Sequence, residues 1–174
     1  MGVKADSENV GLRFFVKISS SLISNLKKLH EDNAVLGSSV PSKDIGYGAV
    51  VVRKSSLKGE LVKSSKSNEF LSSGGIVTVP AAVEYEMYNG YSVYSIYVTG
   101  YTKDYYETEF VVRPYITYKD SNGYLRTYYV NVTGEHAYAN GYSTNLKQTA
   151  HNVYDNSDYN VRRDIQAYIF DAFE

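Results

Sequence analysis

The sequence Val83-Glu-Tyr-Glu-Met-Tyr-Asn-Gly-Tyr-Ser-Val-Tyr-Ser-Ile-Tyr-Val98 decides the fold class, because two alternating runs are joined by Asn-Gly. Alternation at period two is typical of half-buried strands, and Asn-Gly is the preferred centre of a two-residue type I′ hairpin. Such a turn pairs Tyr88 with Tyr91 and fixes which residues share a face. The expected core face holds Val83, Tyr85, Met87, Tyr94, Ile96 and Val98, and the expected half-wet face holds Glu84, Glu86, Tyr88, Tyr91, Val93, Ser95, Tyr97 and Tyr101.

A second hairpin is expected downstream, from Glu109 to Tyr118, with a turn at Asp120-Ser-Asn-Gly123 and a return through about Val132. A loop of two or four residues gives the same assignment of faces. One face then holds Phe110, Val112, Ile116, Tyr118, Leu125, Thr127 and Tyr129, and the other holds Arg113, Tyr115, Thr117, Lys119, Arg126 and Tyr128.

Upstream of the hairpins, residues 10–18 alternate apolar and polar and predict a strand, and residues 47–53 predict another. Ser19, Ser20 or Ser21 is expected to cap a short helix that runs to about His30. Residues 54–75 are rich in Ser and Lys and predict a mobile excursion that buries little. Downstream, residues 144–154 and 159–173 have helical spacing, with Asp158 as a cap for the second helix.

These elements predict a mainly β fold, an immunoglobulin-like β-sandwich with a short helix after the first strand and a helical C-terminal segment. We expect residues 1–9 to form a disordered N-terminal segment. Residues 10–134 are expected to form the β-sandwich module, and residues 135–174 a helical extension packed on it. A chain of 174 residues is long enough for one such cooperative unit.

Charge and composition exclude several classes of partner. The 18 Lys and Arg balance 19 Asp and Glu, so no strong field favours nucleic acid or an anionic membrane. The absence of Cys excludes disulfides and thiolate metal sites. No apolar run approaches the roughly 18 residues of a membrane span, and the first residues are too polar for a signal peptide. Export would therefore need a signal outside this sequence.

No pattern typical of catalysis or cofactor binding emerges, so we expect no catalytic residue, no cofactor and no metal. Glu84 and Glu86 share a strand face, but carboxylates at that spacing are usually only solvated. The histidines, His30, His136 and His151, lack the spacing of a helical metal site. Calcium bound by loop oxygens near residues 155–158 is the alternative left open.

Arg13 and Arg113 each interrupt an apolar strand, where an arginine must reach water or find a partner. We expect structural salt bridges, with Glu84, Glu86 or Glu109 as the acid. The alternative is that both arginines hold an anionic ligand.

The tyrosines are the best binding candidates, because sugar rings stack on aromatic rings while neighbouring polar groups bind the hydroxyls. The chain has 19 Tyr and no Trp. The alternative is that cross-strand tyrosine pairs only stabilise half-exposed sheets, by roughly 0.2 to 1 kcal/mol each. The candidate glycan-binding residues are Tyr88, Tyr91, Tyr97 and Tyr101 with Glu84 and Glu86, and Tyr115 and Tyr128 beside Arg113 and Arg126.

Three segments in order, Gly11-Leu-Arg-Phe14, Tyr47-Gly-Ala-Val-Val-Val52 and Tyr106-Glu-Thr-Glu-Phe-Val-Val-Arg-Pro-Tyr-Ile-Thr-Tyr118, resemble a module of Firmicutes surface proteins. In that module a "GLRF" strand, a "YGTLV" strand and a "REFVARPYVTY" strand recur in this order. The resemblance spans residues 10 to about 132. It implies an all-β, immunoglobulin-like unit beside carbohydrate-active and adhesion domains, without a catalytic role.

Together these features predict a non-catalytic, extracellular accessory module of a larger bacterial surface protein. The expected partners are a polysaccharide or cell-surface glycan and the neighbouring domains of the same polypeptide, with no nucleic acid and no membrane insertion. A structural or assembly role, as a spacer domain or as a phage virion decoration or tail component, is the alternative.

Overall fold

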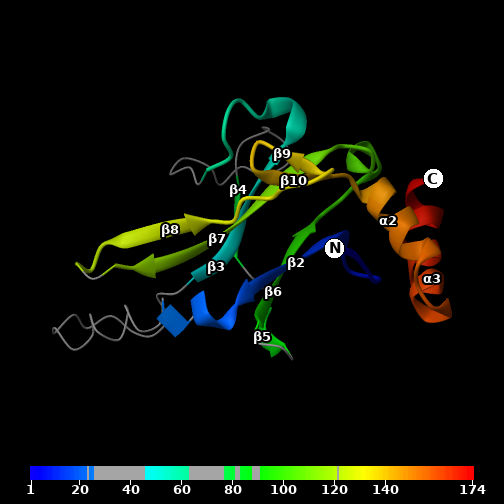
Figure 1. Ribbon diagram of the computed structural model, residues 1–174. Helices are drawn as coiled ribbons and strands as arrows, with labels where there is room; N and C mark the ends of the chain where they lie inside the picture. Colours follow the sequence, from blue (N-terminus) through cyan, green and yellow to red (C-terminus); the bar gives the residue numbers. More distant parts are fainter. Residues whose placement is uncertain (23, 26–45, 63–76, 81–82, 88–90, 121) are drawn as a thin grey trace.

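The computed structural model describes the whole chain except residues 23, 26–45, 63–76, 81–82, 88–90 and 121. Two antiparallel sheets and a C-terminal helical segment make up the described residues, so the prediction of a mainly β fold is confirmed (Figure 1). The four-stranded sheet has the spatial order β1-β2-β6-β5, formed by β1 (Gly2–Ala5), β2 (Val10–Ser19), β6 (Tyr91–Thr99) and β5 (Val83–Met87).

The six-stranded sheet has β7 at its centre. One edge of β7 pairs with β3, and the other edge pairs with β10 near its beginning and with β8 near its end. The members of this sheet are β4 (Val77–Pro80), β3 (Gly46–Arg53), β7 (Phe110–Lys119), β8 (Leu125–Tyr129), β9 (Ala137–Tyr138) and β10 (Gly141–Thr144). The β7–β8 hairpin projects to one side of the molecule (Figure 1).

The main core lies between the sheets and is built by alternation. On β2 the side chains of Leu12, Phe14, Val16 and Ile18 are buried, as the sequence predicts. They pack with residues of β6 in the same sheet and of β3 and β7 in the other sheet. The hydroxyl of the buried Tyr94 on β6 donates to the carbonyl oxygens of Gly48 and Tyr115, at 3.4 and 3.3 Å, and so links the two sheets.

The N-terminal residues differ from the expected disordered segment. Gly2–Ala5 form β1, which pairs antiparallel with the first residues of β2, from Gly2 opposite Arg13 to Ala5 opposite Val10. Val3 and Ala5 also pack against the main core. The backbone pairing and this small apolar contribution explain why a short polar segment is ordered here.

The β7–β8 hairpin has an odd loop, so the predicted assignment of its faces is wrong. Tyr118 pairs with Arg126 and Lys119 with Leu125. The amide of Gly123 donates to Asp120 O, and Gly123 has a φ of 78°. These features are typical of a three-residue loop, in which a type I turn is followed by a left-handed glycine. Ile116 therefore shares a face with Tyr128, and Tyr115 with Tyr129.

The β5–β6 pairing is shifted in the same way. Met87 pairs with Tyr91, which leaves residues 88–90 between the strands instead of two residues. Glu84 pairs with Tyr94 and Glu86 with Ser92. Positions 84 and 86 therefore share a face with the buried Tyr94, opposite to the face of Tyr91 and Tyr97. The predicted set of acids and tyrosines on one face is wrong.

The six-stranded sheet also extends beyond residue 134, where the β-sandwich module was predicted to end. Strands β9 and β10 are joined by Ala139 and Asn140, which both have positive φ angles of 47° and 63°. A two-residue turn with both φ angles positive is the type I′ geometry expected of the other hairpins. Residues 135–144 thus belong to the β part of the molecule.

The C-terminal helices pack at the end of the molecule where β1 lies (Figure 1). They are α2 (Leu146–Asp155), α3 (Tyr159–Ile165), a π-helical stretch (Gln166–Phe170) and α4 (Asp171–Phe173). Asn145 caps α2, and Asp158 caps α3 by accepting from the amide of Val161 at 3.1 Å, as predicted. Buried Leu146, Ala150, Ile165, Ile169 and Phe170 join the main core.

Two other predicted segments are described only in part. Residues 20–22 and 24–25 are helical, and the rest of the helix predicted to reach His30 lies outside the described residues. Residues 54–62 differ from the expected mobile excursion, because Leu61 is fully buried against the six-stranded sheet. Residues 63–75 of that predicted excursion lie outside the described part.

Candidate functional site

The outer face of the four-stranded sheet carries alternating cationic and aromatic side chains. The register pairs Arg13 with Tyr97, Phe15 with Ser95 and Lys17 with Val93, so these residues share one face. Phe15 is 42% exposed and Tyr91 is 38% exposed, whereas Ser95 and Val93 are buried. We call this surface the cation–aromatic face, and it consists of Lys4, Arg13, Phe15, Lys17, Tyr91 and Tyr97.

Every cation of the face lies against an aromatic ring. Lys17 Nζ is 4.1 Å from the centroid of the Tyr91 ring, and Lys4 Nζ is 5.8 Å from that of Tyr97. The Arg13 guanidinium carbon lies 4.4 Å from the Phe15 centroid and 5.2 Å from the Tyr97 centroid. Such contacts hold the cations in place and contribute about 0.5 to 1 kcal/mol each at exposed sites.

Arg13 forms no ion pair with a described side chain, and the side chains of two acids predicted to pair with it, Glu84 and Glu86, lie outside the described part of the chain. Its Nη2 donates to Ser95 Oγ at 3.3 Å, and its Nε is buried without a hydrogen-bond acceptor among the described residues. The two aromatic rings are thus its main contacts. They favour the charged guanidinium without neutralising it.

The β1–β2 turn brings Lys4 onto the face. Asp6 Oδ1 accepts from the amides of Asn9 and Glu8, at 2.8 and 3.0 Å, and Asp6 Oδ2 lies 3.4 Å from Lys4 Nζ. The hydrogen bonds from the Asn9 and Glu8 amides, more than the nearby Lys4, lower the pKa of Asp6. The ionised carboxylate therefore closes the turn and positions β1 against β2.

The outer face of the six-stranded sheet is covered instead of open. Val50, Val52, Leu61, Val111 and Tyr115 form a second buried cluster. Tyr115, a predicted glycan-binding residue, is only 5% exposed and packs edge-on against Tyr129. Burial raises the pKa of its hydroxyl. Tyr115 is therefore a packing residue, and that prediction is wrong.

Arg113 links the chain that covers this second cluster. Its Nη1 donates to Glu60 Oε1 at 2.7 Å and to Leu61 O at 3.0 Å, and its Nη2 donates to Asn131 Oδ1 at 2.6 Å. The predicted salt bridge of Arg113 is present, but its acid is Glu60. Arg113 is 4% exposed, and the hydrogen bond that it donates to Glu60 lowers the pKa of that carboxyl.

The other predicted binding residues are scattered. Tyr101 is buried and packs edge-on against Phe110 at 5.7 Å, so it cannot reach a ligand. Burial raises its pKa, and its hydroxyl has no hydrogen-bond partner among the described residues. The register places positions 84 and 86 opposite Tyr94 and Ser92, and the side chains of Glu84 and Glu86, like the whole of Tyr88, lie outside the described part of the chain.

Tyr128 is exposed but lies on the projecting β7–β8 hairpin, away from Tyr91 and Tyr97 on β6. The register places it opposite Ile116, on the other face from Tyr115. It lines a cavity of about 330 Å³ together with Lys17, Ile18 and Ile116. The two predicted tyrosines of this hairpin therefore do not form one site.

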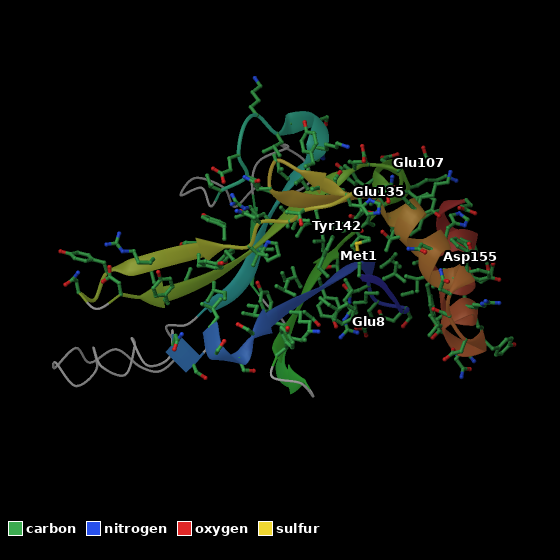
Figure 2. The ribbon with its side chains drawn as sticks, in the orientation of Figure 1. Met1, Glu8, Glu107, Glu135, Tyr142 and Asp155 are labelled. Carbon is green, nitrogen blue, oxygen red and sulfur yellow. The ribbon has the colours of Figure 1, made fainter. Side chains whose placement is uncertain are left out.

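A second, more apolar cavity of about 230 Å³ opens between the sheets, beside β2. Phe14 and Val16 line it from one sheet, and Val112 and Tyr142 line it from the other. Met1 also contributes, and Figure 2 labels Met1 and Tyr142 close together at this point. Among the described residues that line this cavity, Lys17, Tyr142 and the N-terminal residue Met1 carry titratable groups, and the others are apolar.

One cluster outside the cation–aromatic face combines a carboxylate, a histidine and a tyrosine. Tyr106 Oη donates to Glu174 Oε1 at 2.8 Å, and His151 Nε2 lies 2.8 Å from the same oxygen. Burial and the bond to Glu174 raise the pKa of Tyr106, and the bond from Tyr106, then that with His151, lowers the pKa of Glu174. A phenol with a raised pKa is a poor nucleophile. The cluster instead connects the end of α4 with α2 and with the segment between β6 and β7.

The described residues give no evidence of a metal centre or a membrane helix. Within them, no group of three or more His, Cys, Asp or Glu side chains could hold a metal ion. In the same part of the chain, no helix has the length and apolar character needed to cross a bilayer. Near the loop proposed for calcium, Asp158 caps α3 and Asn156 donates to Asn152, so these side chains already have structural roles.

The sequence missed half of the cation–aromatic face. Phe15, Lys17 and Lys4 were not predicted as site residues, although the alternation of β2 places positions 15 and 17 opposite the core.

In comparisons with protein-family models, curated proteins and solved structures, nothing matches this chain.

Proposed function

We propose that the chain is a non-catalytic, extracellular accessory module of a bacterial surface protein, and that it binds a polysaccharide on the cation–aromatic face. Neighbouring domains of the same polypeptide would then carry any catalysis. The observation that supports this proposal is the exposure of Phe15 and Tyr91 on one sheet face, next to half-buried Tyr97.

We propose an immunoglobulin-like topology for the module, as the family resemblance implies. The order β1-β2-β6-β5 corresponds to strands A-B-E-D of that fold, and β4-β3-β7-β8 corresponds to C′-C-F-G. The chain differs at the last position, because β8 and β10 both pair with the same edge of β7. The short β10 would then be a second piece of strand G.

An exposed aromatic sheet face suits a polysaccharide better than a small molecule. Small ligands favour concave pockets that bury most of their surface. Sugar rings instead stack on exposed aromatic rings, and the cations between these rings can bind oxygen atoms of the ligand. The rings of Phe15, Tyr91 and Tyr97 come from adjacent strands, so a chain of sugars can contact more than one of them.

A glycan array with purified protein tests this function. We expect binding to at least one polysaccharide, and a loss of about ten-fold or more in affinity on Tyr91→Ala, because alanine removes a stacking ring. Tyr97→Ala should weaken the same interaction. Tyr138→Ala is the matched control, since this tyrosine is 40% exposed and lies on β9 of the other sheet. Binding to no polysaccharide, or binding that is equal in all variants, would contradict the proposal.

Assembly is the second candidate, and the exposed tip of the β7–β8 hairpin favours it. Tyr124 is 64% exposed, Leu125 62% and Tyr128 47%. Exposed apolar side chains on a projecting hairpin are typical of contacts with another protein. Sedimentation velocity tests this role, because a concentration-dependent oligomer that Leu125→Asp abolishes would favour assembly over glycan binding.

A further inference from the structure

Ion pairing divides the described basic residues into two groups. Six of their side chains, among them Lys4 of the cation–aromatic face, lie within 4 Å of a carboxylate: Lys4, Lys54, Arg113, Arg126, Lys147 and Arg163. Arg13 and Lys17 have no such partner among the described residues, although both lie at the centre of an exposed face. Their charges are therefore available to an incoming anion.

The same rings that form the aromatic surface hold these two cations. Lys17 lies over Tyr91, and Arg13 lies between Phe15 and Tyr97. A ring attracts a cation through its quadrupole but provides no acceptor oxygen, so apart from the bond of Arg13 Nη2 to Ser95 Oγ the donors of both groups have no acceptor among the described residues. A carboxylate or a phosphate would supply those acceptors and form charge-assisted hydrogen bonds.

Among the residues that the structure describes, Asp6 is the acid nearest to the cations of this face, and it already has partners. Asp6 is held in the β1–β2 turn by backbone amides and lies next to Lys4. The register places positions 84 and 86 on the opposite face of β5. The face is thus positive in a protein whose overall charge is −1.

We infer that the ligand of this face is an anionic polysaccharide, with carboxylate or phosphate groups along its chain. This inference rests on the proposed function and names the ligand class for that site. Anionic groups bind Lys17 and Arg13, while the sugar or polyol units contact Phe15, Tyr91 and Tyr97. Arg13 and Lys17 are four residues apart on β2, or about 13 Å, so one ligand must exceed a single sugar to contact both.

Affinity electrophoresis with three polymers tests the ligand class: polygalacturonate, poly(glycerol phosphate) and a neutral galactan. We expect the protein to bind one or both anionic polymers and to prefer them to the galactan. Binding should weaken steeply as NaCl rises, since a salt concentration of 0.15 M screens exposed charges beyond about 8 Å. The two anionic arms distinguish carboxylate from phosphate as the recognised group.

Variants distinguish charge recognition from ring stacking. Lys17→Gln and Arg13→Gln should each weaken binding to the anionic polymer by about five-fold or more and reduce its salt dependence. Arg126→Gln is the matched control, because Arg126 also lies over a tyrosine but is paired with Asp120 at 2.6 Å. Circular dichroism and thermal melting check that each variant is folded.

The outcomes separate the inference from the proposed function. Preference for the neutral galactan, with loss on Tyr91→Ala but no effect of Lys17→Gln, would overturn the anionic ligand and keep polysaccharide binding. An equal effect of Arg126→Gln and Lys17→Gln would overturn the assignment of the charge contact to this face. Binding to no polymer, here and on the glycan array, would overturn both.

Discussion

Both sheets have an outer face on which an arginine lies against tyrosine, but the two faces differ in what covers them. On the six-stranded sheet, Arg113 lies 4.7 Å from the Tyr129 ring and is buried under Leu61 and Glu60. On the four-stranded sheet, Arg13 lies 5.2 Å from the Tyr97 ring and is half-buried, beside a phenylalanine that is 42% exposed.

This difference shows that the surroundings of an arginine, more than its strand position, decide its role. Residues 57–61 supply Arg113 with a carboxylate, a carbonyl and an apolar cover, so its charge is satisfied internally. Arg13 receives only a hydroxyl and aromatic rings from the described residues. One face is therefore part of the folded core, and the other is available for binding.

Matched arginine substitutions should separate the two faces most strongly. We expect Arg113→Met to lower the free energy of unfolding by about 2 to 4 kcal/mol, because it leaves the buried Leu61 carbonyl without this donor and breaks the bonds to Glu60 and Asn131. Arg13→Met should cost less than about 1 kcal/mol, since its contacts are half-exposed. Urea unfolding measures both, and equal losses would remove the distinction between the faces.

Truncation of one apolar side chain on each face should give a smaller difference in the same direction. Leu61→Ala removes a fully buried side chain and should cost about 2 to 3 kcal/mol. Phe15→Ala should cost about 1 kcal/mol, because its ring is partly exposed to water. If Phe15→Ala proved the more damaging in thermal and urea unfolding, the four-stranded sheet would be the covered one.

The Glu60–Arg113 pair should make a modest contribution that depends on pH. Arg113 lowers the pKa of Glu60 in the folded protein, so the pair stabilises the fold above the ordinary pKa of glutamate. This contribution is lost as pH falls through the lowered pKa. The difference in unfolding free energy between wild type and Glu60→Gln should therefore shrink between neutral pH and about pH 3. A difference that stays constant over this range would contradict the pairing.

The sequence predicted the positions of strands and helices well, but it predicted the register between paired strands poorly. Alternation along β2 and the cap at Asp158 depend on neighbouring residues, so local patterns identify the strand and the start of α3. The hairpin registers depend on whether an Asn-Gly pair forms the whole loop or only its end. Gly123 ends a three-residue loop, and that one extra residue exchanges the faces of β8.

Only part of the candidate site could be predicted from the sequence. Tyr91 and Tyr97 were predicted because they alternate on β6, and they do lie on the outer face. Tyr101 was assigned by extending that alternation past Thr99, where β6 ends, and it is buried instead. The cover that Leu61 provides to Tyr115 comes from a distant segment, and no local pattern in the sequence could reveal that contact.

Amide chemical-shift mapping tests the central claim, that the open face of the four-stranded sheet binds the ligand. ¹⁵N-labelled protein is titrated with an oligogalacturonate or with poly(glycerol phosphate), whichever binds more tightly. We expect the largest shifts in β1, β2 and β6, around Arg13, Lys17 and Tyr91, and none in the β7–β8 hairpin beyond noise. Shifts confined to that hairpin or to the C-terminal helices, with β2 and β6 unchanged, would contradict the account.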